Sequence, residues 1–204
     1  MIKVHAIKSM IQRSLERCEP HVIKCYYAPI EFYHSIGTTD ISTQTFEQLD
    51  AGYNPTPILL DSVALHTSHK CVFTTDKLEF LSSSSRALIW LRSAAGDLTF
   101  LFYQPVNVFA IDINDLGNQG PTTLSVKLDE GKFIKVYSSV VGPDGNRRFF
   151  GLRSTKSFRK LTFTNSLAND GIGLDRLQCG LVSHFNGGID KHREAKGIAE
   201  GVTA

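Results

Sequence analysis

Oxygen-bearing side chains gather in a short stretch near the end of the chain. Asn169, Asp170 and Asp175 lie within seven residues, and Gly171 and Gly173 between them permit tight turns of the backbone. Calcium in proteins takes about six to eight oxygen ligands from carboxylates, carbonyls and water. A loop of this composition supplies some of these ligands, so the stretch is a candidate calcium site.

An earlier carboxylate, Glu47, is expected to complete this site. In a β-sandwich the first and last strands lie close together, so an acidic residue of an early strand can approach Asp175. The residues leave an alternative open, in which the Asn-Asp-Gly sequence is an ordinary turn and Asp175 either pairs with Arg176 or accepts a hydrogen bond from a backbone amide. The candidate metal ligands are Glu47, Asp170 and Asp175.

Tyrosines are the candidate ligand-binding residues. A planar aromatic ring stacks on the apolar face of a pyranose when amide or acidic groups lie beside it, because the sugar has both an apolar face and polar edges. The candidates are Tyr53, Tyr103 and Tyr137, and Tyr53 stands in a loop whose Gly and Pro content favours exposure. Packing in the core is the alternative for such rings, and it is the favoured interpretation of Trp90 in the apolar run LIWL.

The chain lacks the familiar motifs of covalent and phosphoryl chemistry. It contains no G-x-S-x-G elbow, no G-x-x-x-x-G-K-[ST] loop and no G-x-G-x-x-G loop. A glycan hydrolase would need two carboxylates that face each other across a cleft. Glu31, Glu47, Asp112 and Asp175 are available, but a sequence does not give their separation. Catalysis is therefore not expected, and glycan hydrolysis is only the third hypothesis.

Composition indicates a globular domain without a marked electrostatic preference. The chain has 204 residues, of which 42% are hydrophobic, and its formal net charge is +2. That balance gives no reason to expect nucleic acid or an anionic membrane as the partner. No apolar run is long enough for a transmembrane helix, and the charged N-terminus does not resemble a secretory signal. The oligomeric state is not predicted by these features.

Four cysteines leave the redox state open. Cys18, Cys25, Cys71 and Cys179 match no zinc or redox spacing. Two disulfides with three alternative pairings are available if the protein is exported, whereas free thiols are expected in a reducing compartment.

Short strands with frequent turn signals predict an all-β fold. Residues 122–128 alternate between apolar and polar side chains, which is typical of a half-buried antiparallel strand. Residues 98–103 and 106–113 are predicted strands separated by a turn at Gln104-Pro105, and the Asp-Gly pair at 144–145 predicts a hairpin. Basic residues between 147 and 160 alternate with apolar ones, which indicates a solvated strand face. An amphipathic helix is expected within residues 1–17.

Several of these segments resemble a known group of domains. The pieces are TFEQLDAG, VNVFAIDINDLG, TTLSVKL, RRFFGLRS, FRKLTFTN and NDGIGLDRLQCG. They resemble the jelly-roll domains of secreted bacterial proteins with PEP-CTERM sorting signals and, more distantly, the galactose-binding-like sandwiches used as carbohydrate-binding modules. In those modules, an early acidic residue and an aspartate of the last strand hold a structural calcium. The resemblance implies that role for Glu47 and Asp175, with Asp170 as a further ligand.

The sequence and the resemblance together predict an antiparallel β-sandwich of jelly-roll type. Residues 40–180 form this domain, residues 1–39 an N-terminal arm with a short helix, and residues 181–204 a C-terminal tail. By resemblance, the protein is expected to be extracellular or at the cell surface. It is expected to bind carbohydrate or matrix polymer without catalysis, with Ca²⁺ as a structural ion. A structural or adhesive domain that assembles with other proteins is the alternative.

Overall fold

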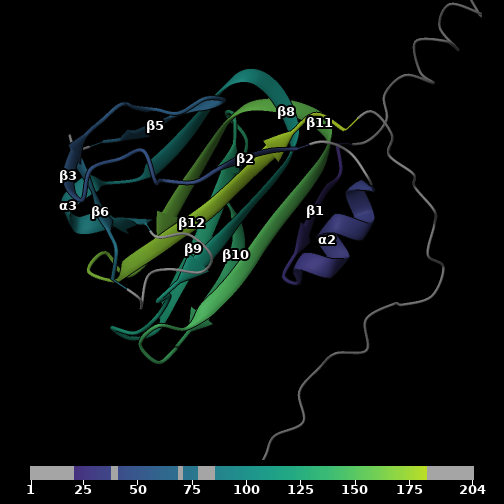
Figure 1. Cartoon of the computed structure of the whole chain (residues 1–204). Helices are drawn as coiled ribbons and strands as arrows, with labels where there is room; N and C mark the ends of the chain where they lie inside the picture. The colour runs from purple at the N-terminus through teal and green to yellow at the C-terminus, as the bar shows by residue number, and fades with distance from the viewer. Residues whose placement is uncertain (1–20, 38–40, 69–70, 78–85, 183–204) are drawn as a thin grey trace, which may run out of the picture.

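Antiparallel strands make up most of the folded chain (Figure 1). The structure is a computed structural model that describes residues 21–37, 41–68, 71–77 and 86–182, so the predicted helix within residues 1–17 and most of the predicted tail lie outside it. Its elements are β1 Ile23–Tyr26, α2 Pro29–Ile36, β2 Ser42–Gln44, β3 Gly52–Pro55, β4 Ile58–Leu59, β5 Val63–Thr67, β6 Cys71–Thr75, β7 Ala87–Leu91, α3 Arg92–Ala95, β8 Leu98–Asn114, β9 Thr122–Leu128, β10 Ile134–Val140, β11 Arg147–Asn165 and β12 Gly171–Gly180. The predicted all-β class is confirmed.

The described strands form one hydrogen-bonded sheet that folds over itself in the manner of a jelly roll (Figure 1). Its main path runs β10-β9-β11-β8-β12-β7-β6-β3, while β1, β2, β4 and β5 pair with strands of this path or with one another. All of the pairings are antiparallel. This arrangement is the sandwich that the sequence predicted, and its apolar core lies between the layers.

Two long strands, β8 and β11, run through both parts of the sandwich. Their pairing extends from Arg147 opposite Asn114 to Phe163 opposite Leu98. The register shifts between Arg153 and Phe158, so the pair bends there. The predicted turn at Gln104-Pro105 is wrong, because β8 continues through it. Proline, which has no N–H to donate, is tolerated at such an interruption of the ladder.

Aromatic rings fill the centre of the core. Phe100, Phe109, Phe150 and Phe163 are fully buried, and their ring centroids lie 5.5 to 6.4 Å apart in the contacting pairs. Edge-to-face and tilted arrangements of this kind are the ones that aromatic quadrupoles favour. Trp90 of β7 is also buried, as its apolar sequence context predicted.

The predicted N-terminal arm, residues 1–39, contains β1 and α2, and both elements contact the sheet. Strand β1 pairs with β11, and α2 packs on the outer face of that strand through Phe32 and Ile36. Pro29 occupies the first turn of α2, where its missing N–H costs nothing, and Gly37 ends the helix with a φ of 68°. The buried guanidinium of Arg153 donates to the carbonyl of Ser35 and so ties β11 to the helix.

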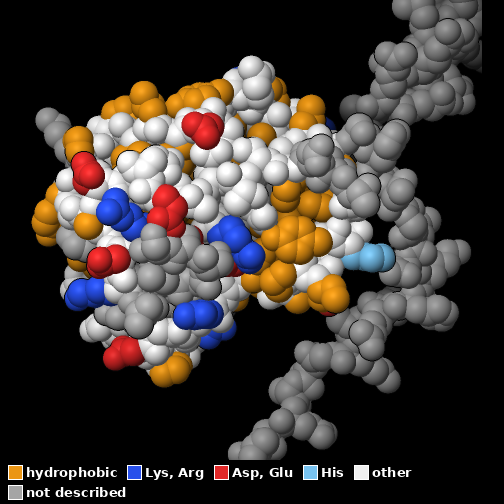
Figure 2. All heavy atoms as spheres, in the orientation of Figure 1, with side chains coloured by type: hydrophobic (Ala, Val, Ile, Leu, Met, Phe, Trp, Pro, Cys, Tyr) orange, Lys and Arg blue, Asp and Glu red, His pale blue; other side chains and the backbone are white. Residues whose placement is uncertain are grey.

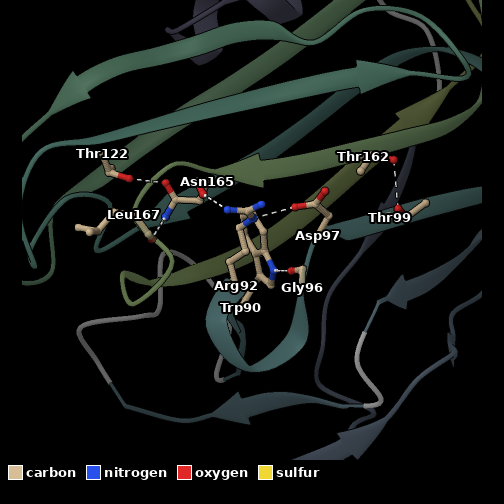
Figure 3. A network of polar contacts seen from close by, with 9 residues as sticks. All are labelled: Trp90, Arg92, Gly96, Asp97, Thr99, Thr122, Thr162, Asn165 and Leu167. Atoms are coloured by element: carbon tan, nitrogen blue, oxygen red, sulfur yellow. Dashed lines mark hydrogen bonds and ion pairs between the residues drawn. The ribbon is translucent and has the colours of Figure 1, made fainter.

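A polar network fastens the turn after β7 to the end of β11 (Figure 3). The indole Nε1 of Trp90 donates to the carbonyl of Gly96 at 2.7 Å. Arg92 donates through Nε to Asp97 at 2.9 Å and through Nη1 to the carbonyl of Asn165 at 3.1 Å. These bonds satisfy polar groups at the edge of the aromatic core, which would otherwise be costly to bury.

Two of the four cysteines can be placed, and both are free thiols. Cys25 is half-buried in β1 and Cys179 is buried in β12, and burial raises the pKa of each thiol. Cys18 lies outside the described residues, and nothing can be said of the Cys71 side chain. No helix in the described part of the chain is long and apolar enough to cross a membrane.

The packing of α2 on β11 depends on a glycine. A Cβ added to Gly151 would lie 2.6 Å from Cδ2 of Phe32, closer than side chains tolerate. We therefore expect Gly151→Ala to lower the free energy of unfolding by about 1–3 kcal/mol through overpacking. Gly171→Ala is the matched control, because its Cβ would meet Ile89 at an ordinary 3.9 Å. Chemical denaturation of both variants measures the difference, and equal stabilities would contradict this packing constraint.

Candidate functional site

A hollow of about 520 Å³ opens where the ends of several strands meet β1 and α2. Its polar and aromatic lining consists of Tyr27, Asp112, Tyr137, Arg147, Arg148 and Arg176, with Pro29 and Phe149 completing the wall. These residues come from six parts of the chain: the β1–α2 connection, α2, β8, β10, β11 and β12. Figure 2 shows hydrophobic side chains on the side where β1 and α2 lie in Figure 1, with Lys and Arg side chains beside them.

Two tyrosines form an aromatic wall. The rings of Tyr27 and Tyr137 meet edge to face with centroids 5.4 Å apart, and Tyr27 is 52% exposed. The Tyr137 hydroxyl donates a hydrogen bond of 2.7 Å to the carbonyl of Phe149. Burial raises the pKa of Tyr137 to about 12, although Arg148 opposes this shift. The phenol therefore stays neutral, and its ring orientation is fixed by the bond to β11.

Arg148 stacks on this wall. Its guanidinium carbon lies 5.5 Å from the centroid of the Tyr137 ring, within the range of a cation–π contact. The Nε of Arg148 is buried and has no hydrogen-bond acceptor among the described residues. Arg147, the preceding residue, is exposed, and its side chain makes no ion pair with any described residue. Within the described part of the chain, the hollow thus presents two guanidinium groups that form no ion pair.

The third arginine is held by an aspartate. Arg176 Nε lies 3.0 Å from Asp112 Oδ2, and Arg176 Nη2 donates to Asp112 Oδ1 at 3.2 Å. Strand β12 bulges at this point, since its register against β8 shifts between Asp175 and Gln178 and Arg176 has a left-handed φ of 46°. Bulges commonly redirect a side chain next to a functional site. The resulting two-point ion pair keeps both planar groups in place at the wall of the hollow.

The predicted metal ligands do not form one cluster. Glu47 is exposed in the turn after β2, whereas Asp170 and Asp175 are fully buried. Asp175 Oδ1 accepts the backbone N–H of Arg176 at 2.7 Å, which is one of the alternatives that the sequence left open. Among the residues placed by the structure, no three His, Cys, Asp or Glu side chains are grouped to hold a metal. A site built from the three carboxylates together is therefore not supported by this geometry.

The buried carboxylate of Asp170 accepts hydrogen bonds from the loop after β8. Its Oδ2 accepts the backbone N–H of Gly117 at 2.9 Å, and this bond ties the β12 approach to the loop after β8. Burial raises the pKa of the Asp170 carboxyl, while hydrogen bonds from Gly117, Gln119 and Asn165 act in the opposite direction.

The three predicted ligand-binding tyrosines lie on different strands. Tyr53 is 79% exposed on β3 at the far end of the sheet order, and Tyr103 is 45% exposed on β8. Only Tyr137 lines the hollow.

Sequence reasoning missed Tyr27, Asp112 and all three arginines as parts of one site. The Arg147-Arg148 pair directly after the Asp-Gly turn was the available signal, but it was interpreted as a solvated strand face. Arg153 of the same segment is in fact buried.

Comparisons with known proteins give only weak structural likenesses. The sequence matches no protein-family model and no curated protein. Among solved structures, the chain is similar to the CBM22-1 xylan-binding domain from Paenibacillus barcinonensis Xyn10C, with a TM-score of 0.43 and 16% identity over 70% of this chain and 95% of that one. It is also similar to TmCBM61 in complex with β-1,4-galactotriose, with a TM-score of 0.40 and 14% identity over 66% of this chain and 92% of that one.

A third similar structure is the catalytic domain of a GH87 α-1,3-glucanase, with a TM-score of 0.39 and 13% identity over 71% of this chain and 28% of that one. Likenesses at this level do not identify a function.

Titration of Asp170 is expected to make stability depend on pH. Because burial raises its pKa above the ordinary value of 3.8, folding favours the protonated carboxyl. Its stabilising contribution is complete below the pKa of the unfolded chain and is lost as pH rises through the higher folded pKa. Asp170→Asn should remove this decline, so the variant gains stability relative to the parent as pH rises.

Denaturant unfolding in the presence of EDTA at several pH values measures this effect. Asp76→Asn, at an exposed aspartate, is the control and should follow the parent. Parallel pH profiles for the parent and Asp170→Asn would contradict the effect of burial.

Proposed function

We propose that this chain is a non-catalytic carbohydrate-binding module that acts outside the cell or at its surface, with the hollow as its binding site. The observation that carries the proposal is the combination of an exposed tyrosine wall with fixed arginine and aspartate groups in one concavity. The compartment follows from the resemblance seen in the sequence and remains part of the proposal.

The lining matches what a sugar ring requires. Tyr27 and Tyr137 offer apolar ring surface to the C–H face of a pyranose, while Arg176 and Asp112 offer donors and acceptors to its hydroxyl groups. A volume of about 520 Å³ lies within the range of small-ligand sites. The Tyr137–Phe149 hydrogen bond and the Arg176–Asp112 pair fix these groups before a ligand arrives, which lowers the entropic cost of binding.

The same residues support binding without hydrolysis. Glycoside hydrolysis commonly requires two carboxylates about 5 to 10 Å apart. Asp112 is the one carboxylate among the described residues that line the hollow, and Arg176 holds it in an ion pair. Tyr137 is a poor general base because its pKa is raised to about 12. A protein with this lining is better suited to hold a glycan than to cleave it.

A structural calcium remains a further part of the proposal. Asp175 and Asp112 are directly opposite residues of β12 and β8, so two buried carboxylates stand on neighbouring strands. Calcium held by Asp175 would take backbone carbonyls and water for most of its ligands, since Glu47 is exposed and the acidic residues do not cluster. No step of ligand recognition depends on this ion.

The tyrosine wall gives the first test of the binding proposal. Tyr27→Ala should weaken binding about tenfold, because the half-exposed ring is an accessible apolar surface of the hollow. Retention on a panel of neutral and acidic polysaccharides, followed by affinity electrophoresis, measures the loss. Tyr53→Ala is the matched control, since it removes an exposed tyrosine from β3.

The two tyrosine variants also separate the hollow from the sequence prediction. Loss of binding in Tyr53→Ala with full binding in Tyr27→Ala would place the ligand at β3 and overturn the assignment to the hollow. Absence of retention on every polymer of the panel would count against carbohydrate binding altogether.

The calcium hypothesis is tested by thermal unfolding. EDTA is expected to lower the Tm and excess Ca²⁺ to restore it, because an ion that binds only the folded chain stabilises it by mass action. Asp175→Asn should lose this response while it keeps a similar side-chain volume. A melting curve that EDTA leaves unchanged would rule out a stabilising calcium in the folded protein.

A further inference from the structure

If the hollow binds carbohydrate, as proposed above, the net charge of its lining indicates which class of carbohydrate it binds. Its described lining holds three guanidinium groups and one carboxylate, so it has two positive charges in excess. We propose that the hollow binds an acidic glycan and that Arg147 and Arg148 receive the carboxylate of a uronic acid residue in that glycan.

The excess charge is concentrated on Arg147 and Arg148. Asp112 offsets the charge of Arg176 through contacts of 3.0 and 3.2 Å, so this pair adds no net charge to the hollow. Arg148 stacks on Tyr137, and neither Arg148 nor Arg147 forms an ion pair with a described residue. Both guanidinium groups line the hollow, and each can donate charge-assisted hydrogen bonds to a carboxylate bound there.

Arg148 also has a donor without a hydrogen-bond partner among the described residues. Its Nε is buried and has no acceptor there, and the same is true of the Arg176 Nε. A buried donor without a partner is costly, and ligand sites are among the places where such a group persists. An oxyanion bound in the hollow beside Arg148 would lie next to a guanidinium group that forms no ion pair with a described residue.

The aromatic wall favours an anion that is part of a sugar over a free anion. A free oxyanion would use the arginines but would gain nothing from the exposed ring of Tyr27. A uronic acid joins both features, because its carboxylate projects from a pyranose ring that can stack on tyrosine. Its size also suits the hollow of about 520 Å³ better than an inorganic anion does.

The test compares polymers that differ only in charge. Polygalacturonate and its fully methyl-esterified form share the same rings and linkages, but esterification removes the negative charge. Affinity electrophoresis in both gels should show binding to the free acid that is at least about tenfold tighter, because charge-assisted hydrogen bonds to arginine are lost in the ester. Dextran and dextran sulfate form a second pair, in which the anion is a sulfate.

Variants then assign the effect to the hollow. Arg147→Gln should weaken binding to polygalacturonate about tenfold and leave the weak binding to the ester unchanged. Lys156→Gln is the matched control, since it removes one exposed positive charge from the same strand outside the hollow. Because Arg147 is exposed, the substitution should leave the melting temperature unchanged.

Each other outcome has a distinct meaning. Equal retention on the acid and the ester would overturn the anionic ligand while carbohydrate binding stands. An equal loss in Arg147→Gln and Lys156→Gln would mean attraction by net charge alone and would also overturn the inference.

Retention on dextran sulfate but not on polygalacturonate, or full competition by sodium sulfate at constant ionic strength, would replace the uronic acid by a sulfate. Absence of binding to all four polymers would count against the proposed function itself.

Discussion

The antiparallel pairing of β8 with β11 is the constraint on which the rest of this molecule depends. Both strands are long enough to take part in the two layers of the sandwich, and the shift of register between Arg153 and Phe158 lets them bend from one layer into the other. Phe100, Phe109, Phe150 and Phe163 all lie on this pair, so the bend also brings the aromatic core together. Strands β1, β9 and β5 then pair with β8 or β11, which already define the frame of the sheet.

The hollow lies at one end of the β8–β11 pair. Strand β8 finishes and β11 begins at the same edge, where Arg147 is opposite Asn114 and Phe149 is opposite Asp112. The arginines and the aspartate are therefore placed by backbone hydrogen bonds instead of a long loop. Sites on regular elements hold their geometry more closely than sites on loops, which suits a protein that recognises a ligand without closing over it.

Local patterns in the sequence predicted the fold class well and the site poorly. The alternation in β9 correctly placed Leu124, Val126 and Leu128 inside, because a period of two depends only on adjacent side chains. The helix α2 was missed, although Pro29 at its start and the buried Phe32 and Ile36 at a spacing of four were signals of it.

The hollow brings together residues separated by up to about 150 positions, and its geometry depends on register shifts. No local sequence pattern indicates that Tyr27 lines the hollow. Nor does one indicate that Arg176 forms an ion pair with Asp112 at a bulge in β12. Tyr137 was predicted because an aromatic side chain in a strand is itself a signal, whereas arginines on a strand are usually only solvated. The calcium prediction and the positions of the domain ends outside residues 21–182 stay predictions.

The close contact between Gly151 and Phe32 has a consequence for ligand binding. It holds α2 against β11, and Tyr27 of the β1–α2 connection forms one wall of the hollow together with Pro29 of α2. Detachment of this N-terminal segment would open that wall, so a ligand in the hollow binds the docked state in preference to the detached one. Binding and local unfolding are then thermodynamically linked, and occupancy of the hollow should slow hydrogen exchange in α2 although the helix lies on the outer face of the sheet.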